Sequence, residues 1–262
     1  AAGEVRSRSA PNLRRAGVRV LAAAAIAAAL LSLPAPAAPA TLSDPAVDAF
    51  NVRVGTQTFA PKYRFTSESA LVETAEAIRS MGSDVIKFAM GRGVERQYGI
   101  PSSGSITSLA AQAREEPSCR RVLDMPFRHF LIWSYPFASR GDTPWRDGFS
   151  AGERQREYDE IHAFTRHLLT HYAGSGKSFY LGHWEGDWYL LPNYNTRTNP
   201  SPETIQGMID WLNTRQQAVD DATRDTPHHG VQVYHYTEVN RVRDAMLNGP
   251  DSNRRLVDTV LP

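Results

Sequence analysis

The chain has 262 residues, of which 41% are hydrophobic and 22% are charged, so it can bury one core of the α/β-barrel size class. Its 29 basic and 28 acidic residues are spread along the sequence and give a formal net charge of +1. This composition excludes a disordered or fibrous protein. The even charge gives no basic patch of the kind that binds nucleic acid, so we expect no nucleic-acid partner and a neutral ligand instead.

The N-terminal region has the pattern of a secretory signal. Arg14, Arg15 and Arg19 precede an apolar run from Val20 to Leu33, and residues 34–40 are proline and small residues suited to cleavage. The run is shorter than the roughly 20 residues that span a bilayer. We therefore predict a secreted, periplasmic or cell-surface protein without a stable membrane anchor, a permanent anchor being the alternative.

Two regions follow from this reading. Residues 1–40 are predicted to be the signal peptide with an upstream extension, and residues 41–262 to be a single folded domain. Cys119 is the only cysteine, so the exported domain folds without an internal disulfide. His228 and His229 are adjacent in a turn-like segment, and no metal-ligand spacing occurs. We expect neither a metal nor a cofactor.

Strands and helices are predicted to alternate along the domain. Apolar runs predict strands over residues 51–59, 84–90, 129–135, 178–183 and 231–237. Helical spacing predicts helices over residues 68–81, 105–115, 153–172, from 202 onward and over 253–260. Ser201 is the predicted N-cap of the fourth helix, with Pro202 at its first position. The alternation predicts an α/β fold, a (β/α)8 TIM barrel that is incomplete in this chain, with about five to six β/α units.

Polar and aromatic side chains gather at the predicted carboxyl ends of these strands, where α/β barrels bind their ligands. The densest group follows the fourth strand, in the segment Lys177 to Trp188. Indole rings stack on sugar faces, while carboxylates, amides and imidazoles bond sugar hydroxyls, so the predicted ligand is carbohydrate. The predicted substrate-binding residues are Gln57, Trp133, His183, Trp184, Asp187, Trp188, His235, Tyr236, Glu238 and Asn240.

Glu185 is the predicted catalytic residue. Glycosidic cleavage needs two carboxyl groups about 5 to 10 Å apart, one of which protonates the leaving oxygen. Trp184 and Trp188 give Glu185 apolar surroundings that are expected to raise its pKa, as a general acid requires. Asp187 is the acid expected to bind a hydroxyl.

This layout resembles the retaining (β/α)8-barrel glycoside hydrolases of the cellulase and β-mannanase superfamily. In that clan the acid/base glutamate ends the fourth strand, which matches Glu185, and the nucleophile ends the seventh strand, which would lie beyond Pro262. Trp184 stands where the clan usually has asparagine. The resemblance implies a C-terminally truncated member that cleaves O-glycosidic bonds in a polysaccharide or glycoconjugate when full length.

Other interpretations remain open at this stage. One alternative is a non-catalytic carbohydrate-binding barrel, in which the same aromatic residues hold sugar without cleaving it. Another is an unrelated hydrolase in which Glu185 and Glu238 are the two catalytic carboxyl groups. Each residue also has a structural explanation: Glu185 as a hydrogen-bond acceptor, Glu238 as a loop cap and Trp133 as a core residue. Lys87 either points into the barrel and pairs with an acid or extends outward.

Overall fold

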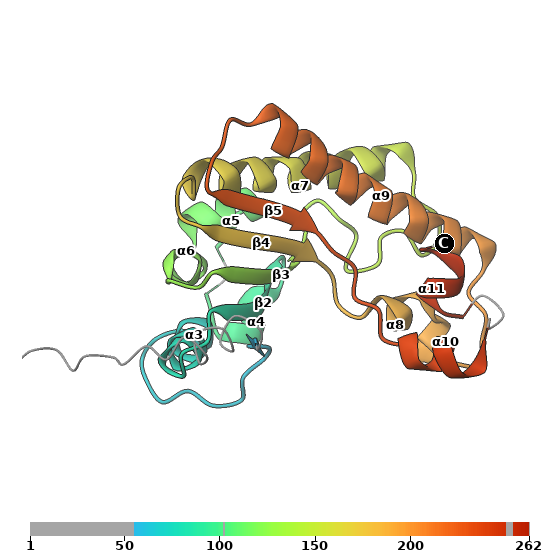
Figure 1. Cartoon of the computed structure of the whole chain (residues 1–262), viewed down its shortest axis with the longest axis horizontal. Coiled ribbons are helices and arrows are strands. Elements are labelled where there is room, and N and C mark those ends of the chain that lie inside the picture. The colour runs from blue at the N-terminus through green and yellow to red at the C-terminus, as the bar shows by residue number, and fades with distance from the viewer. Residues whose placement is uncertain (1–54, 102, 250–253, 262) are drawn as a thin grey trace, which may run out of the picture. The chain divides into compact units, whose positions relative to one another are not determined.

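A computed structural model describes residues 55–101, 103–249 and 254–261 (Figure 1). The predicted signal peptide, the first part of the strand predicted over residues 51–59 and the start of the helix predicted over 253–260 lie outside these residues. In the part of the chain that is described, no helix is both long enough and apolar enough to cross a membrane.

The core of the fold is one parallel sheet. Its five strands are β1 (Thr56–Gln57), β2 (Val85–Gly91), β3 (His129–Tyr135), β4 (Lys177–Gly182) and β5 (Val231–His235). Each strand pairs in parallel with the next one along the chain, so the spatial order is β1-β2-β3-β4-β5. This confirms the predicted α/β fold with a parallel sheet. Because the order never reverses, right-handed crossovers place every connecting helix on the same face.

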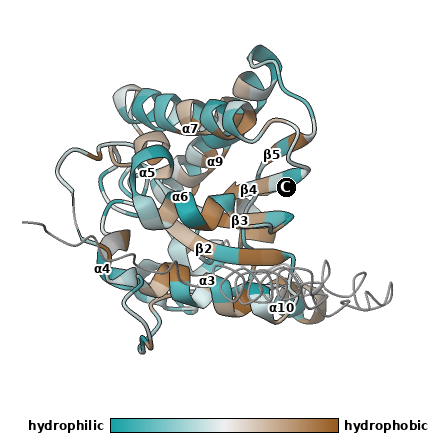
Figure 2. Ribbon diagram, turned by 90° about the vertical axis from the view of Figure 1, so that its left-hand side faces the viewer, coloured by the Kyte–Doolittle hydropathy of each residue, from teal (hydrophilic) through white to brown (hydrophobic). Residues whose placement is uncertain are grey.

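The connecting helices begin at side-chain caps that the sequence supplies. They are α3 (Ala70–Ser80), α5 (Leu109–Glu115), α6 (Pro117–Asp124), α7 (Ala151–His171) and α9 (Pro202–Asp225). Ser201 caps α9 as predicted, because its Oγ accepts the Thr204 N–H at 3.1 Å. Ser150 and Glu153 form a capping box at the start of α7. Figure 2 shows these helices gathered around one side of the sheet.

The two faces of the sheet differ because side chains alternate along each strand. The face toward the helices carries a fully buried row in register across four strands: Ile86, Phe130, Phe179 and Val233. The opposite face, away from these helices, carries the neighbouring row of Lys87, Leu131, Tyr180 and Tyr234. None of this second row is buried, and Tyr234 is 43% exposed. The apolar core therefore lies between the sheet and its helices.

Short helices that the sequence pattern did not predict lie mostly beyond the carboxyl ends of the strands (Figure 1). They are α4 (Val94–Tyr98), α8 (Gly186–Leu190), the 3-10 helix η1 (Pro192–Tyr194) and α10 (Val242–Asn248). The last helix, α11 (Leu256–Thr259), lies within the helix predicted over residues 253–260. A second cluster of buried residues joins α8, α9 and α11, with Trp145, Leu190, Trp211 and Leu256 among its members. The loops at this edge therefore rest on a packed core of their own.

A buried ion pair fixes the ends of the central strands. Arg215 on α9 and Glu157 on α7 are in contact at 2.9 Å, and their side chains are 0% and 1% exposed. Arg215 also donates to the carbonyl oxygens of Ser134 and Gly182, at 3.0 Å each. The last residue of β4 is thereby tied to the helical layer.

Candidate functional site

Glu238, in the loop after β5, organises a group of side chains at the carboxyl edge of the sheet. Its Oε1 forms an ion pair with Lys87 Nζ and accepts hydrogen bonds from Trp133 Nε1 at 2.7 Å and from the Tyr236 hydroxyl at 3.3 Å. Its Oε2 accepts the backbone N–H of Glu185 at 3.0 Å. We call these five residues the Glu238 cluster. They come from β2, β3 and the loops after β4 and β5, as expected for strands that end at one edge.

The electrostatics of the cluster keep Glu238 ionised. Burial acts to raise the pKa of Glu238, but the Lys87 ammonium, the Trp133 indole and the Glu185 amide together lower it below its ordinary value. Lys87 Nζ also lies 4.5 Å from the centre of the Trp133 ring, a cation–π contact. Both oxygens of Glu238 are thus occupied by protein donors. This matches a carboxylate that holds other groups in place.

Glu185 has the opposite character. In the described structure its carboxylate makes no hydrogen bond or ion pair, and the residue is half-buried, as are Trp184 and Trp188, which are close to it in sequence. Its backbone is left-handed, with φ 26° and ψ 79°, a region that a side-chain-bearing residue adopts at a cost. Two hydrogen bonds hold this conformation. The Glu185 amide donates to the Glu238 carboxylate, and the Gly186 amide donates to the Glu238 carbonyl oxygen at 3.0 Å. A carboxyl group without a protein partner is thereby held at the edge of the sheet.

Asp187 accepts hydrogen bonds from backbone amides. It is 0% exposed, and its oxygens accept the N–H groups of Asn240 at 2.7 Å, Arg241 at 3.1 Å and Leu256 at 2.9 Å. These contacts connect α8 to the loop after β5 and to α11. Asp187 was expected to bind a sugar hydroxyl, but its oxygens are buried and accept hydrogen bonds from the protein backbone instead.

The two histidines of the predicted site lie behind it. His183 is fully buried against Tyr189 and Trp211, and burial lowers its pKa to about 4. Burial, with Arg215 and His183 nearby, also holds the pKa of His235 well below its usual value. Both imidazoles are therefore neutral near pH 7. His183 therefore has a packing role, which differs from the sugar contact expected of it, whereas His235 is half-buried.

The remaining predicted residues divide into two groups. Trp133 and Tyr236 belong to the Glu238 cluster, with Trp133 only 4% exposed. Gln57 and Asn240 are exposed at the rim. Gln57 is beside Lys87 in the β1–β2 register, and the Asn240 amide is held by Asp187.

Residues outside the predicted set also shape the site. Phe59 is 46% exposed, and its ring meets Trp133 edge to face, with the centroids 5.0 Å apart. The Tyr135 hydroxyl accepts the Trp184 amide at 3.1 Å and bonds the Tyr189 hydroxyl, also at 3.1 Å. Alternation along β2 places Lys87 on the face opposite to that of the buried Ile86. The alternation of side chains along this strand was the feature of the sequence from which the position of Lys87 could have been predicted.

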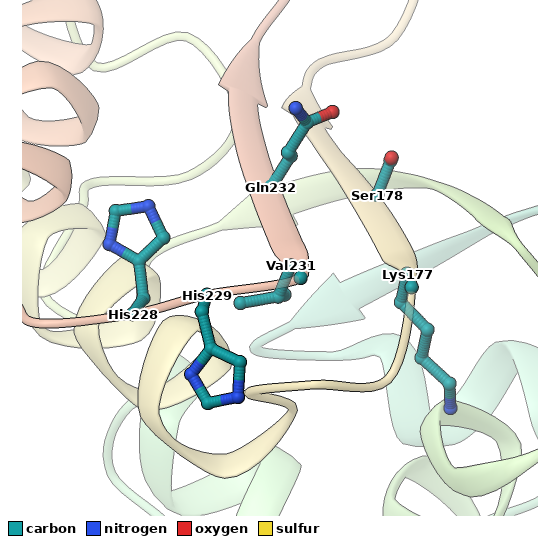
Figure 3. A pocket seen from close by; sticks show the side chains of 8 residues that line it. Lys177, Ser178, His228, His229, Val231 and Gln232 are labelled. Carbon is teal, nitrogen blue, oxygen red and sulfur yellow. The ribbon is translucent and has the colours of Figure 1, made fainter.

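A different hollow lies at the amino-terminal edge of β4 and β5. It has a volume of about 430 Å³ and includes His228, His229, Ser178 and Gln232 in its wall. Figure 3 shows that these side chains do not converge on one point, and Lys177 turns away to the carbonyl oxygen of Leu123. Across the described residues, no group of three or more His, Cys, Asp or Glu side chains is arranged to hold a metal ion. The carboxyl edge is thus the better candidate for chemistry.

Comparison with known proteins adds no relative: no family model, curated protein or solved structure matches this chain. The class of protein is therefore set by the fold alone, an α/β protein with a parallel sheet.

We predict that Glu238→Gln lowers the free energy of unfolding by about 1–3 kcal/mol at pH 7, because Lys87 loses its charged partner. The pKa of Glu238 is lowered in the folded state, so its stabilising effect is present above the ordinary glutamate pKa of about 4.3 and is lost as the pH falls through the folded-state value. Urea unfolding at pH 7 and below pH 4 should show the difference between variant and wild type shrinking in acid. Glu115→Gln, in an exposed pair with Arg114, is the control and should change little. A difference that stays constant with pH would contradict the ion pair.

The left-handed backbone of Glu185 gives a second prediction. Glycine normally lowers stability relative to alanine by about 0.5–1 kcal/mol, but at a left-handed residue the order reverses. Glu185→Gly should therefore melt at a higher temperature than Glu185→Ala. At Gln155, an exposed position within α7, the glycine variant should melt lower than the alanine variant. The same order at both positions would show that Glu185 is not strained.

Proposed function

We propose that this protein is a secreted, glycoside hydrolase-like enzyme that cleaves O-glycosidic bonds in a polysaccharide or glycoconjugate, with Glu185 as the general acid/base. The observation that carries the proposal is the contrast between the two glutamates at one edge. Among the described residues, the half-buried Glu185 has no hydrogen-bond or ion-pair partner for its carboxylate, whereas Glu238 is ionised and both of its oxygens are bonded. A group that exchanges a proton with substrate must be free to reach it.

In the proposed reaction, Glu185 protonates the glycosidic oxygen as the bond to the leaving sugar breaks. Trp184, Trp188 and the exposed face of Phe59 supply apolar surfaces on which sugar rings stack. Glu238 and Lys87 act from behind, by holding the Glu185 backbone in its left-handed turn. The second carboxylate of the reaction is then a residue other than Glu238, whose oxygens are already occupied.

We further propose that the sheet belongs to a (β/α)8 barrel. Two features support this: the strands follow one another in sequential order, and the face away from the helices carries large side chains in register, including the stacked Tyr180 and Tyr234. In a closed barrel this face is the interior. Further parallel strands would cover it and pair with the outer edge of β5.

A test of the barrel is hydrogen exchange on the protein isolated from its natural source. The β5 amides that do not pair with β4 should exchange slowly, because the next strand of a closed barrel accepts them. Fast exchange at these amides, with slow exchange at the amides that pair with β4, would show an open sheet edge.

The test of the activity uses Glu185→Gln. Once a hydrolysed glycan is found, the variant should lose roughly 10²–10⁴-fold in kcat, while affinity for the glycan changes little. The loss should be much smaller on an aryl glycoside whose phenolate leaves without a proton. Glu115→Gln is the control of equal charge change. Equal losses on both substrates would remove Glu185 as the acid, and binding of glycans without any hydrolysis would favour a non-catalytic carbohydrate-binding barrel.

A further inference from the structure

A hollow lined by residues that follow β2 and β3 has a composition that differs from the Glu238 cluster. Its volume is about 460 Å³, and its wall is formed by Arg92, Gly93, Arg96, Ser103, Gly104, Ile106, Thr107 and Phe137. We call it the Arg92 hollow. Arg92 directly follows β2, which ends at Gly91, and Phe137 lies two residues after β3, which ends at Tyr135. The hollow therefore lies at the carboxyl ends of β2 and β3, the strands that carry Lys87 and Trp133.

The wall of the hollow is positively charged. It has two guanidinium groups and two hydroxyl side chains, and none of its residues is acidic. Arg92 donates one N–H to the carbonyl oxygen of Phe137, which orients the guanidinium. A guanidinium has five N–H donors, so the Phe137 bond leaves others for a ligand. Within the described residues, neither Arg92 nor Arg96 forms an ion pair, so their charge is available to an anion.

The size and the apolar part of the wall identify the kind of anion. A water molecule has a share of about 30 Å³ in the liquid, so the hollow is much larger than a bare ion needs. Its volume is in the range of about 300–1,000 Å³ that is common for small-molecule sites. Ile106 and the buried Phe137 add apolar surface to the wall. An anionic group carried on a ring fits this combination of charge and apolar contact.

We propose that the Arg92 hollow binds a sugar residue that carries a carboxylate, sulfate or phosphate, and so makes the protein selective for acidic glycans. Arg92 and Arg96 bond the anionic group, and Ile106 and Phe137 contact the ring. The assignment of the anion to a glycan rests on the proposed function, whereas the binding of an oxyanion does not. Arginine suits this task because its planar fork matches carboxylate, sulfate and phosphate oxygens.

Calorimetric titration of the full protein tests the proposal with four probes: sodium sulfate, sodium phosphate, a uronic-acid oligosaccharide and a neutral oligosaccharide of the same length. The wild type should bind the acidic oligosaccharide more tightly than the neutral one. Arg96→Gln and Arg92→Gln should each weaken the acidic complex by roughly tenfold or more and leave the neutral complex unchanged. Arg96→Gln is the cleaner variant, since Arg96 makes no hydrogen bond or ion pair among the described residues. Arg156→Gln, an exposed arginine on α7, removes the same charge elsewhere and should change neither complex.

Each other result overturns the proposal in a recognisable way. Equal affinity of the wild type for the acidic and neutral oligosaccharides removes the selectivity. Arginine-dependent binding of sulfate or phosphate alone, without binding of either oligosaccharide, removes the sugar and leaves a site for a free anion. An equal loss in Arg156→Gln would reduce the effect to overall charge. Failure of the proposed hydrolysis is separate, because Glu185→Gln should bind the acidic oligosaccharide as the wild type does.

Discussion

The buried contact between Arg215 and Glu157 is the constraint on which the carboxyl edge depends. Arg215 bonds Glu157, the carbonyl oxygen at Ser134 near the end of β3 and the carbonyl oxygen at Gly182, where β4 ends. Glu157 is held in turn by Trp211 Nε1 at 2.8 Å. A buried ion pair adds little net stability, because desolvation offsets the attraction, but removal of one partner leaves an uncompensated charge. The pair therefore favours a single arrangement of the two strand ends, and the segment that carries Glu185 begins directly after Gly182.

From this fixed point the loops build outward through backbone contacts made by acidic side chains. Asp187 collects the amides of the loop after β5 and of α11, and Glu238 holds the amide of Glu185. Three acidic residues that stand close together, in sequence or in space, thus have different tasks. Two are bonded to the protein, and the Glu185 carboxylate has no partner among the residues that the structure describes, on a backbone conformation that its neighbours impose. Strain that is held by surrounding contacts is typical of functional positions, where stability is exchanged for a defined side-chain placement.

The sequence predicted the regular part of this structure well, because hydrophobic periodicity and capping are local signals. The strand over residues 129–135 and the Ser201 cap were predicted at the positions found. The site was harder, since the segment after β4 turns immediately into α8, so simple alternation no longer says which side chains point outward. His183 and Asp187 consequently lie in the interior, although their position at the end of the predicted fourth strand suggested a ligand-facing role. The pairing of Lys87 with Glu238 joins residues far apart along the chain, and only the strand order brings them together.

Lys87 lies on the sheet face that is turned away from the helices and is paired with Glu238, in the loop after β5. Its row continues through Leu131 to Tyr180 and Tyr234, which are apolar or aromatic, so an ammonium in this row needs a partner. Glu238 supplies that partner, and the same carboxylate then fixes Trp133 and the Glu185 turn. The Glu238 carboxylate thus has two effects: it neutralises the Lys87 ammonium, and it positions Glu185, the proposed acid. Because Lys87 is paired with Glu238, its charge is not available to a ligand, whereas Arg92 and Arg96 form no ion pair within the described part of the chain. In the proposed enzyme, Arg92 and Arg96 would attract an acidic glycan, and Glu185 would transfer the proton that cleaves it. Lys87, which is paired with Glu238, would take part in neither step directly.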